Sequence, residues 1–369
     1  MTIVFDVPVR ERAQRLLGDG SVLTAWIVSR LVVALGLAIG YGWRTGTATD
    51  DGFSVWDGRW YRHIALAGYG GPPRLGHQSP WPFFPLLPAL MHLVHTAHLP
   101  EVAIIVVANH ALILLALIGV RRLADRHFGP DVARWSVWIL AVFPMTAVFS
   151  MVYPSAIFLT ASVWAFELTE QQRFRAAGIV AAVATMVRPN GLIVAIVLTA
   201  ITLTIEPAEP VGRRRSIAIR QGAPSAIAIV GWIVICARRT GNPLVFITAK
   251  TAWHELTAIG FIGRLGDDVH LDSATIHISL GVIAAIGLWA AWHHLPHSWR
   301  ALATIALAVP LATGLVGLGR YSNECFPLAI AGGIALTHAP RWARTTTLIT
   351  STTTAFALAV AIASHGLVP

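Results

Sequence analysis

Long apolar stretches, separated by short polar ones, run through most of the chain and limit the folds that it can adopt. A membrane-spanning helix needs about 20 mostly apolar residues, and fewer where the helix is broken or shielded by its neighbours. We therefore predict an all-α membrane protein with about eleven spans, and a further helix lying at the interface over 84–98. The predicted spans are 22–41, 101–120, 132–150, 153–168, 175–187, 190–205, 223–237, 274–292, 301–318, 325–338 and 345–366.

The composition supports a polytopic membrane protein. Hydrophobic residues make up 55% of the chain and charged residues 12%, whereas soluble domains carry about 25% charged residues. The mean hydropathy is +0.65. A net charge of +9 would suggest nucleic acid binding in a soluble protein, but here the arginines lie between apolar runs, as in cytoplasmic loops that face anionic lipid. The two cysteines, Cys236 and Cys325, form neither a disulfide framework nor a zinc site.

The arginines also predict the orientation, because cytoplasmic loops carry an excess of Lys and Arg. With the N-terminus in the cytoplasm, sixteen of the 27 basic residues lie inside and nine outside, while Arg30 and Arg188 lie within apolar stretches. This predicts a multi-pass plasma-membrane protein whose loop 42–98 and second polar segment 238–273 are extracytoplasmic. No internal repeat is visible, so residues 1–369 are expected to form one membrane domain.

The first polar loop carries most of the residues suited to chemistry. Residues 56–70 read WDGRWYRHIALAGYG, and residues 80–88 read PWPFFPLLP. A carboxylate can take a hydroxyl proton, a guanidinium binds phosphate, and aromatic faces cover the apolar side of a sugar ring. The loop therefore indicates chemistry on sugars and phosphates beside a membrane surface.

The pairing of these two blocks resembles the first-loop signature of the PIG-V-type mannosyltransferases, which are integral-membrane glycosyltransferases of the GT-C class. Three later blocks resemble family elements in the same order: RPNG at 188–191, GNPLVF at 241–246 with Trp253, and GRY at 319–321 with FP at 326–327. One block departs from the family. Tyr153-Pro154-Ser155 is followed by Ala156 where the family has a glutamate, so no acidic role is carried over.

The resemblance implies a function. It implies an inverting GT-C glycosyltransferase that moves a mannosyl, or more generally a hexosyl, group from a polyprenyl-phosphate-sugar donor. The acceptor would be a glycan or glycolipid on the non-cytosolic face, and the lipid donor, the acceptor and the membrane would be the partners, with no nucleic acid. The Ala- and Arg-rich composition is typical of a bacterial, and in particular an actinobacterial, member.

Asp57 is the predicted general base. A sugar transfer from a lipid phosphate requires the acceptor hydroxyl to lose a proton, and a nearby carboxylate serves this purpose. The resemblance implies the same role, since Asp57 falls on the aspartate of the family motif. The alternative is a loop aspartate that caps a helix at Gly58–Tyr61.

A metal site built from Asp57 with Asp50 and Asp51 is the less favoured interpretation. The loop has no D-x-D motif and no histidine cluster, so solvated loop acids are expected at these positions. We predict no cofactor and no metal.

Arginines supply the predicted phosphate contacts. Arg59 and Arg62 would share a helix face near Asp57, with His63 adjacent, although lipid headgroups are an equal alternative. Arg188 interrupts an apolar stretch and is predicted to meet the lipid phosphate, unless it pairs with a carboxylate or with helix ends. The other predicted donor-phosphate residues are Arg238 and Arg239, which alternatively anchor the chain at the interface, and Arg320 with Tyr321.

Aromatic residues of the first loop are the predicted stacking partners of the sugar or acceptor. They are Trp56, Trp60, Tyr61, Tyr69 and Trp81.

The main rival is a polytopic transporter or lipid flippase. Arg30 and Arg188 within apolar stretches, with broken helices at 188–191 and near 310, would suit a pathway through the bilayer. A transporter gives no reason for an aspartate–aromatic loop on one face, and the chain lacks two similar halves. A noncatalytic subunit with a degenerate transferase fold is a third possibility, against which the presence of Asp57 argues.

Overall fold

The structure is a computed structural model that describes residues 20–42, 53–204, 210–253, 273–364 and 366–369. Asp50 and Asp51 lie outside the described residues, as does most of the second polar segment. In the described part of the chain every regular element is a helix, in agreement with the prediction of an all-α fold.

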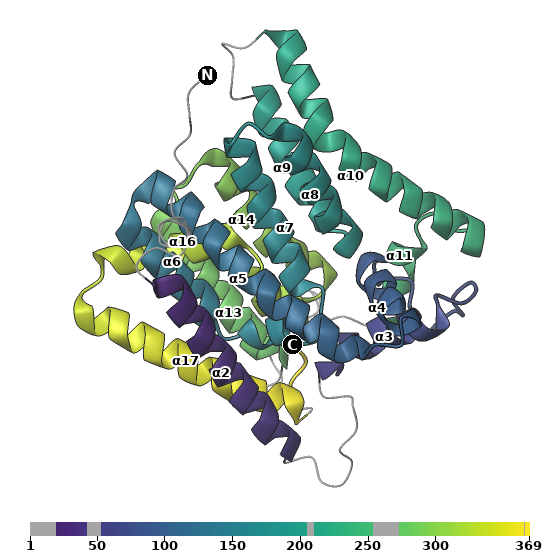
Figure 1. Ribbon diagram of the computed structural model, residues 1–369, viewed down its shortest axis with the longest axis horizontal. Coiled ribbons are helices and arrows are strands. Elements are labelled where there is room, and N and C mark those ends of the chain that lie inside the picture. Colours follow the sequence, from purple (N-terminus) through teal and green to yellow (C-terminus); the bar gives the residue numbers. More distant parts are fainter. Residues whose placement is uncertain (1–19, 43–52, 205–209, 254–272, 365) are drawn as a thin grey trace, which may run out of the picture.

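The helices follow one another along the chain as labelled in Figure 1. They are α2 (Ser21–Gly42), α3 (Asp57–Ala67), α4 (Leu86–Thr96), α5 (Glu101–Phe128), α6 (Pro130–Val142), η2 (Thr146–Ser150), α7 (Ser155–Glu170), α8 (Phe174–Val187), α9 (Gly191–Thr204), α10 (Val211–Thr240), α11 (Val245–Thr248), η3 (Ala249–Trp253), α13 (Ser273–Ala291), α14 (His297–Thr313), η4 (Leu315–Gly317), α15 (Leu318–Asn323), α16 (Phe326–His338) and α17 (Arg341–Ala363).

Five helices of the described residues, α2, α5, α10, α13 and α17, are long and apolar enough to cross a membrane. The protein is therefore an integral membrane protein. The six helices that coincide with the other predicted spans, α6, α7, α8, α9, α14 and α16, are shorter. The count of about eleven spans stays a prediction.

The predicted span 132–150 is not a single helix. Helix α6 ends at Val142, and the chain continues after Pro144 as the short η2. Proline lacks the backbone N–H that a continuing helix would need, which explains the break. By contrast, α5 continues well beyond its predicted end to Phe128, where Gly129 with a φ of 85° allows the turn into α6.

The long helices pack into one bundle. Helix α2 lies along α17, α5 packs against α6 and α7, and α8 packs against α10 (Figure 1). Side chains from several helices fill the core, including Leu117 of α5, Leu140 of α6 and Phe326 of α16. Each of these side chains is almost fully buried, so the bundle has a continuous apolar core.

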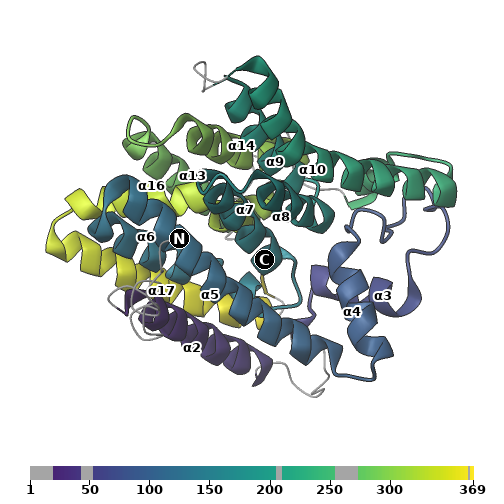
Figure 2. The ribbon, with the colours of Figure 1, turned by 45° about the horizontal axis from the view of Figure 1, so that its top comes forward.

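The first polar loop forms a separate layer at the N-terminal end of α5. Helices α3 and α4 lie there beside the bundle, and the C-terminal end of α10 reaches the same region (Figures 1 and 2). Aromatic rings join the two polar segments, with centroids 5.3 Å apart for Trp60 and Trp253 and 5.5 Å for Phe84 and Phe246. The two segments that were predicted to share one side of the membrane are therefore in contact.

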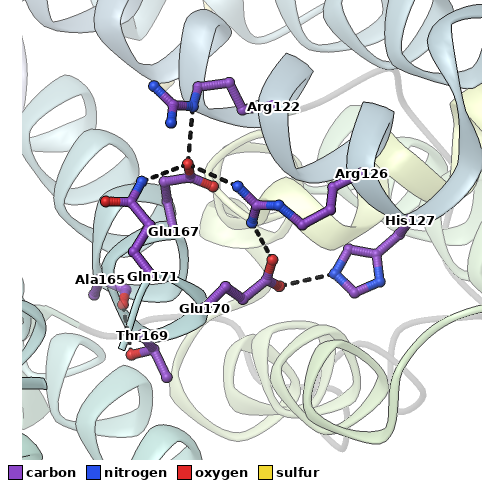
Figure 3. A network of polar contacts seen from close by, with 8 residues as sticks. All are labelled: Arg122, Arg126, His127, Ala165, Glu167, Thr169, Glu170 and Gln171. Atoms are coloured by element: carbon purple, nitrogen blue, oxygen red, sulfur yellow. Dashed lines mark hydrogen bonds and ion pairs between the residues drawn. The ribbon is translucent and has the colours of Figure 1, made fainter. Parts of the chain in front are cut away.

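A charged network joins α5 and α7 near their C-terminal ends (Figure 3). Nε of Arg122 and Nη2 of Arg126 lie 2.8 Å and 3.0 Å from the same carboxylate oxygen of Glu167. Arg126 and His127 both contact Glu170. At 1.5 Å per residue, Arg122 lies roughly 30 Å along α5 from Glu101. The network is thus about one hydrocarbon thickness from the end of α5 beside α3.

Candidate active site

Asp57 is the first residue of α3, where a carboxylate favours the positive end of the helix dipole. Its carboxylate does not cap the helix, because Trp56 takes the cap position and makes no side-chain cap bond. The capping role considered for Asp57 is therefore not what the structure shows. Trp56 has a φ of 54°, an uncommon value for a residue other than glycine, and this turns the chain sharply into α3.

Asp57 pairs with Arg320, which comes from α15 near the other end of the chain. The two side chains are joined by a 2.9 Å hydrogen bond from Nη1 of Arg320 to Oδ2 of Asp57. The Asp57 side chain is 31% exposed and that of Arg320 is 12% exposed. The carboxylate is thus held in place by a largely buried cation while remaining accessible from outside.

Two tyrosines flank the guanidinium of Arg320. Its Cζ lies 5.6 Å from the ring centroids of both Tyr153 and Tyr321, within the range of cation–π attraction. Burial lowers the pKa of Arg320, but the nearby charges, that of Asp57 foremost, outweigh this effect and hold the pKa well above its usual range. Arg320 therefore stays positive at every physiological pH.

The segment from η2 to Tyr153 supports the Asp57 loop. The backbone N–H of Asp57 donates to the Tyr153 hydroxyl at 3.1 Å, and the N–H of Val152 donates to the carbonyl of Phe53 at 2.6 Å. A Cβ on Gly58 would lie 3.2 Å from the Val152 carbonyl, so glycine permits this close approach.

Two buried side chains in the bundle hold this supporting segment. Nη2 and Nη1 of Arg30 donate to the hydroxyls of Thr146 and Ser150 at 2.6 Å and 2.7 Å. The Asn109 amide donates to the carbonyl of Met151 at 2.7 Å. Helices α2 and α5 thus fix the position of Asp57 through the chain beneath it.

Arg188 forms a buried ion pair with Glu324. The Arg188 side chain is 8% exposed and that of Glu324 is 1% exposed. It also donates to the hydroxyl of Ser155 at 3.2 Å and lies over the ring of Tyr321 at 5.6 Å. Pairing with a carboxylate was the alternative considered for Arg188, and the structure shows that pairing. Contact with a lipid phosphate stays a prediction.

The other basic residues that were predicted to bind the donor phosphate lie on α3 and at the C-terminal end of α10. Arg62 forms a 3.1 Å ion pair with Glu101 at the start of α5. Arg59 and His63 are exposed on α3. Arg238 and Arg239 are exposed at the C-terminal end of α10, and no contact places them beside Asp57 in the described part of the structure.

The predicted stacking residues fall into two groups. Tyr61 and Trp81 are buried, and Trp81 packs against Trp232 and Tyr69, so both serve the apolar core of the loop. Burial raises the pKa of Tyr61, whose phenol therefore stays protonated. Trp56, Trp60 and Tyr69 are half-buried.

Several residues of the site were not predicted. Tyr153 contacts Asp57, and Ser155 and Glu324 contact Arg188. Asn323 precedes Glu324 in the chain. A signal for Glu324 was present, because a carboxylate next to an apolar run needs a cation and Arg188 needed an anion. Tyr153 and Ser155 belong to the block that resembles a family element without its glutamate, whereas the sequence offered no signal for Asn323.

A small pocket, partly open to solvent, lies beside this group. Its lining includes Tyr321 and Glu324, with Asn190 from the α8–α9 turn and apolar side chains such as Phe158 and Leu302. Among the residues that the structure describes, no three His, Cys, Asp or Glu side chains gather as a metal-binding group.

No family model and no curated protein matches the chain. Among solved structures, the chain is similar to the Archaeoglobus fulgidus oligosaccharyltransferase tethered to an acceptor peptide that contains the NVT sequon. The TM-score is 0.50 at 14% identity, with 96% of this chain and 56% of that chain covered. The same enzyme in its apo form gives a TM-score of 0.47 at 12% identity, covering 91% and 56%. Its complex with an inhibitory peptide and a dolichol-phosphate gives 0.43 at 13% identity, covering 92% and 56%.

The first of these likenesses shows that the chain shares the fold of that part of the oligosaccharyltransferase that it covers. The chain spans about half the length of the oligosaccharyltransferase that it resembles.

Proposed function

We propose that the protein is a GT-C glycosyltransferase that moves a mannosyl or other hexosyl group from a polyprenyl-phosphate-sugar to a glycan or glycolipid. The reaction would take place on the non-cytosolic face of the plasma membrane, with inversion and without a metal. The observation that carries the proposal is the Asp57–Arg320 pair, in which an accessible carboxylate on a GT-C fold is held by a largely buried cation. The resemblance of the first loop to PIG-V-type mannosyltransferases supports mannose as the sugar.

In the proposed mechanism Asp57 takes the proton of the acceptor hydroxyl. The hydroxyl oxygen forms a bond to the anomeric carbon, and the bond from that carbon to the phosphate oxygen breaks. The electron pair of the broken bond leaves with the polyprenyl phosphate. Arg320 orients the Asp57 carboxylate, and its positive charge stabilises the negative charge that develops on the phosphate.

Among the predicted phosphate ligands, the structure favours Arg320 with Tyr321 for the proposed role. Arg188 and Arg62 each hold a carboxylate, so a phosphate at either position would have to displace Glu324 or Glu101.

Arg59 and His63, exposed on α3, would meet the donor headgroup at the surface. Arg238 and Arg239 would serve the lipid at the edge of the same layer, and Trp56, Trp60 and Tyr69 would stack on the sugar or acceptor.

The proposal is tested with the purified protein in liposomes that contain polyprenyl-phosphate-mannose labelled in the sugar. Label is followed into glycolipid, glycan and peptide acceptors, the last because the similar oligosaccharyltransferase was solved with an acceptor peptide. The wild type is expected to transfer mannose, and Asp57→Asn to lose transfer while inserting and folding normally. Asp131→Asn is the matched control, since Asp131 is an exposed carboxylate at the start of α6.

Two outcomes would overturn the proposal. Equal transfer by the wild type and Asp57→Asn would place the base elsewhere. If no acceptor is labelled, while the same liposomes show movement of a solute or lipid that depends on the protein, the transporter or flippase interpretation replaces it.

A further inference from the structure

The segment that carries Arg320 also carries a concentration of buried polar atoms without a hydrogen-bond partner. In the described part of the structure these are Nε of Arg320, both polar side-chain atoms of Asn323, and Oε1 of Glu324. Asn323 is 2% exposed and Glu324 is 1% exposed. Unpaired buried polar atoms lower stability, and native proteins keep few of them. Their concentration within five consecutive residues is a feature that packing does not explain.

These atoms lie close to the proposed reacting groups. Asn323 and Glu324 follow Arg320 by three and four residues. Because residues at this spacing lie on one face of a helix, all three lie on the same side of α15, with Glu324 as the residue that ends it. Nη1 of the same Arg320 is bonded to Asp57. Glu324 and Tyr321 line the small pocket beside the site. One short segment therefore contacts Asp57 through Arg320 and lines the pocket through Tyr321 and Glu324, and Asn323 lies next to Glu324 in the chain.

The chemistry of the unpaired atoms selects a class of ligand. The Asn323 amide both donates and accepts, the Glu324 oxygen accepts, and Nε of Arg320 donates. A phosphate only accepts, so it would leave the oxygens of Asn323 and Glu324 unpaired. A metal cation is disfavoured by Arg188 and Arg320, which lie against the same residues. Hydroxyl groups both donate and accept, so a ring with several hydroxyls pairs all of these atoms.

We propose that Asn323 and Glu324 form a subsite that binds the hydroxyl groups of a hexose. The subsite rests on the proposed function, because the hexose is either the transferred sugar or the sugar of the acceptor. Arg320 joins this subsite to Asp57, and the ring of Tyr321 lies beside it. The subsite makes Asn323 and Glu324 determinants of which sugar is used.

Asn323→Leu separates this role from a structural one. The amide makes no hydrogen bond within the protein, so its replacement by an apolar side chain of similar size is expected to leave thermal stability unchanged or raise it. The same variant is expected to lower kcat/KM for transfer by about 10- to 100-fold. Ser225→Ala is the matched control, because Ser225 is a fully buried, unpaired side chain on α10. It is expected to change neither property of the enzyme.

Deoxy sugars identify the hydroxyl that is bound and its source. The wild type should lose about as much kcat/KM with the correct deoxy sugar as Asn323→Leu loses with the full sugar. Asn323→Leu should lose nothing further with that deoxy sugar. If the two losses fail to add for one of a series of deoxy donors, the subsite binds the transferred sugar. If they fail to add for one of a series of deoxy acceptors, the subsite binds the acceptor. Wild-type kcat/KM in Asn323→Leu, or independent losses with every deoxy sugar, would reject the subsite.

The subsite can fail while the proposed function stands, since the wild type would then transfer mannose and Asn323→Leu would do so equally well. If the wild type transfers no sugar, the proposed function fails, and the subsite is tested by binding instead. Saturation-transfer NMR in nanodiscs then compares contact of polyprenyl-phosphate-mannose with the wild type and Asn323→Leu. Contact that is lost in the variant supports the subsite, and identical spectra reject it.

Discussion

Oδ2 of Asp57 and Nη1 of Arg320 lie 2.9 Å apart although 263 residues separate them in the chain. Asp57 begins α3 in the first polar loop, and Arg320 belongs to the short helix α15 that follows α14. The pair joins the loop layer to the helix bundle. In the proposed mechanism, the positive charge of Arg320 stabilises the phosphate leaving group.

Replacement of Arg320 tests the importance of this charge. Arg320→Met is expected to lower kcat by about 100- to 1000-fold, as for other losses of a group that stabilises developing charge. Arg320→Lys should restore part of this loss, because the ammonium keeps the charge but not the planar contact with Tyr153 and Tyr321. Transfer assays with saturating donor and acceptor give kcat directly. Wild-type kcat in Arg320→Met would exclude a role for the charge.

The buried pair of Arg188 and Glu324 is expected to matter for stability. Arg188→Met removes the direct ion-pair partner of the buried Glu324 carboxylate and should cost about 3–5 kcal/mol in the free energy of unfolding. The double variant Arg188→Met/Glu324→Leu removes both charges and should regain most of that loss. Unfolding in detergent micelles measures both effects. Equal stability of the single and double variants would contradict the prediction.

Arg30 is expected to hold the supporting segment beneath Asp57. Arg30→Met removes the donor to the Thr146 hydroxyl and one of the two partners of the Ser150 hydroxyl, which keeps His110 at 3.0 Å. The unpaired group at Thr146 should cost about 1–3 kcal/mol. The N–H of Val152, which bonds to Phe53, should then exchange with solvent faster. Hydrogen exchange read by mass spectrometry checks this, with Met at the exposed position Arg175 as the control. Unchanged exchange at Val152 would show that Arg30 does not support the loop.

The network of Figure 3 predicts a contrast between a buried and an exposed carboxylate. Glu167 is fully buried and receives Arg122 and Arg126, so Glu167→Ala should cost about 1.5–3 kcal/mol of stability. Asp131 pairs with Arg134 at the surface, and Asp131→Ala should cost less than about 1 kcal/mol. The unfolding midpoints of Glu167→Ala and Asp131→Ala, measured in the same detergent, test this difference in stability. Similar midpoints would mean that the network does not clamp α5 to α7.

Glycine allows α2 and α17 to pack closely. A Cβ on Gly40 would lie 2.4 Å from the carbonyl oxygen of Val360 and 2.7 Å from the Cβ of Ala363. Gly40→Ala should therefore push the helices apart and cost about 1–3 kcal/mol. Gly42→Ala, on the same helix but with nothing within 4 Å, should be neutral or stabilising. Thermal unfolding of the two variants compares these outcomes, and equal midpoints would contradict the close packing.

The amino-acid sequence by itself determined the class of fold and the approximate position of most helices. Apolar runs and polar breaks are local properties, and a chain with 55% hydrophobic residues has few ways other than helices to satisfy its backbone in a bilayer. The sequence also singled out Asp57 and Arg320, because a family-like block surrounds each of them. It misjudged helix ends, as at 132–150, where Pro144 interrupts an otherwise apolar run.

Only the tertiary structure decided which residues meet. The partnerships of Asp57 with Arg320 and of Arg188 with Glu324 join segments far apart in the chain, and no local pattern specifies such a contact. The burial of Trp81 against Trp232 likewise depends on α10 reaching the first loop. A local pattern reports which face of a helix is apolar, whereas the neighbour that covers the face is set by the packing of the whole bundle.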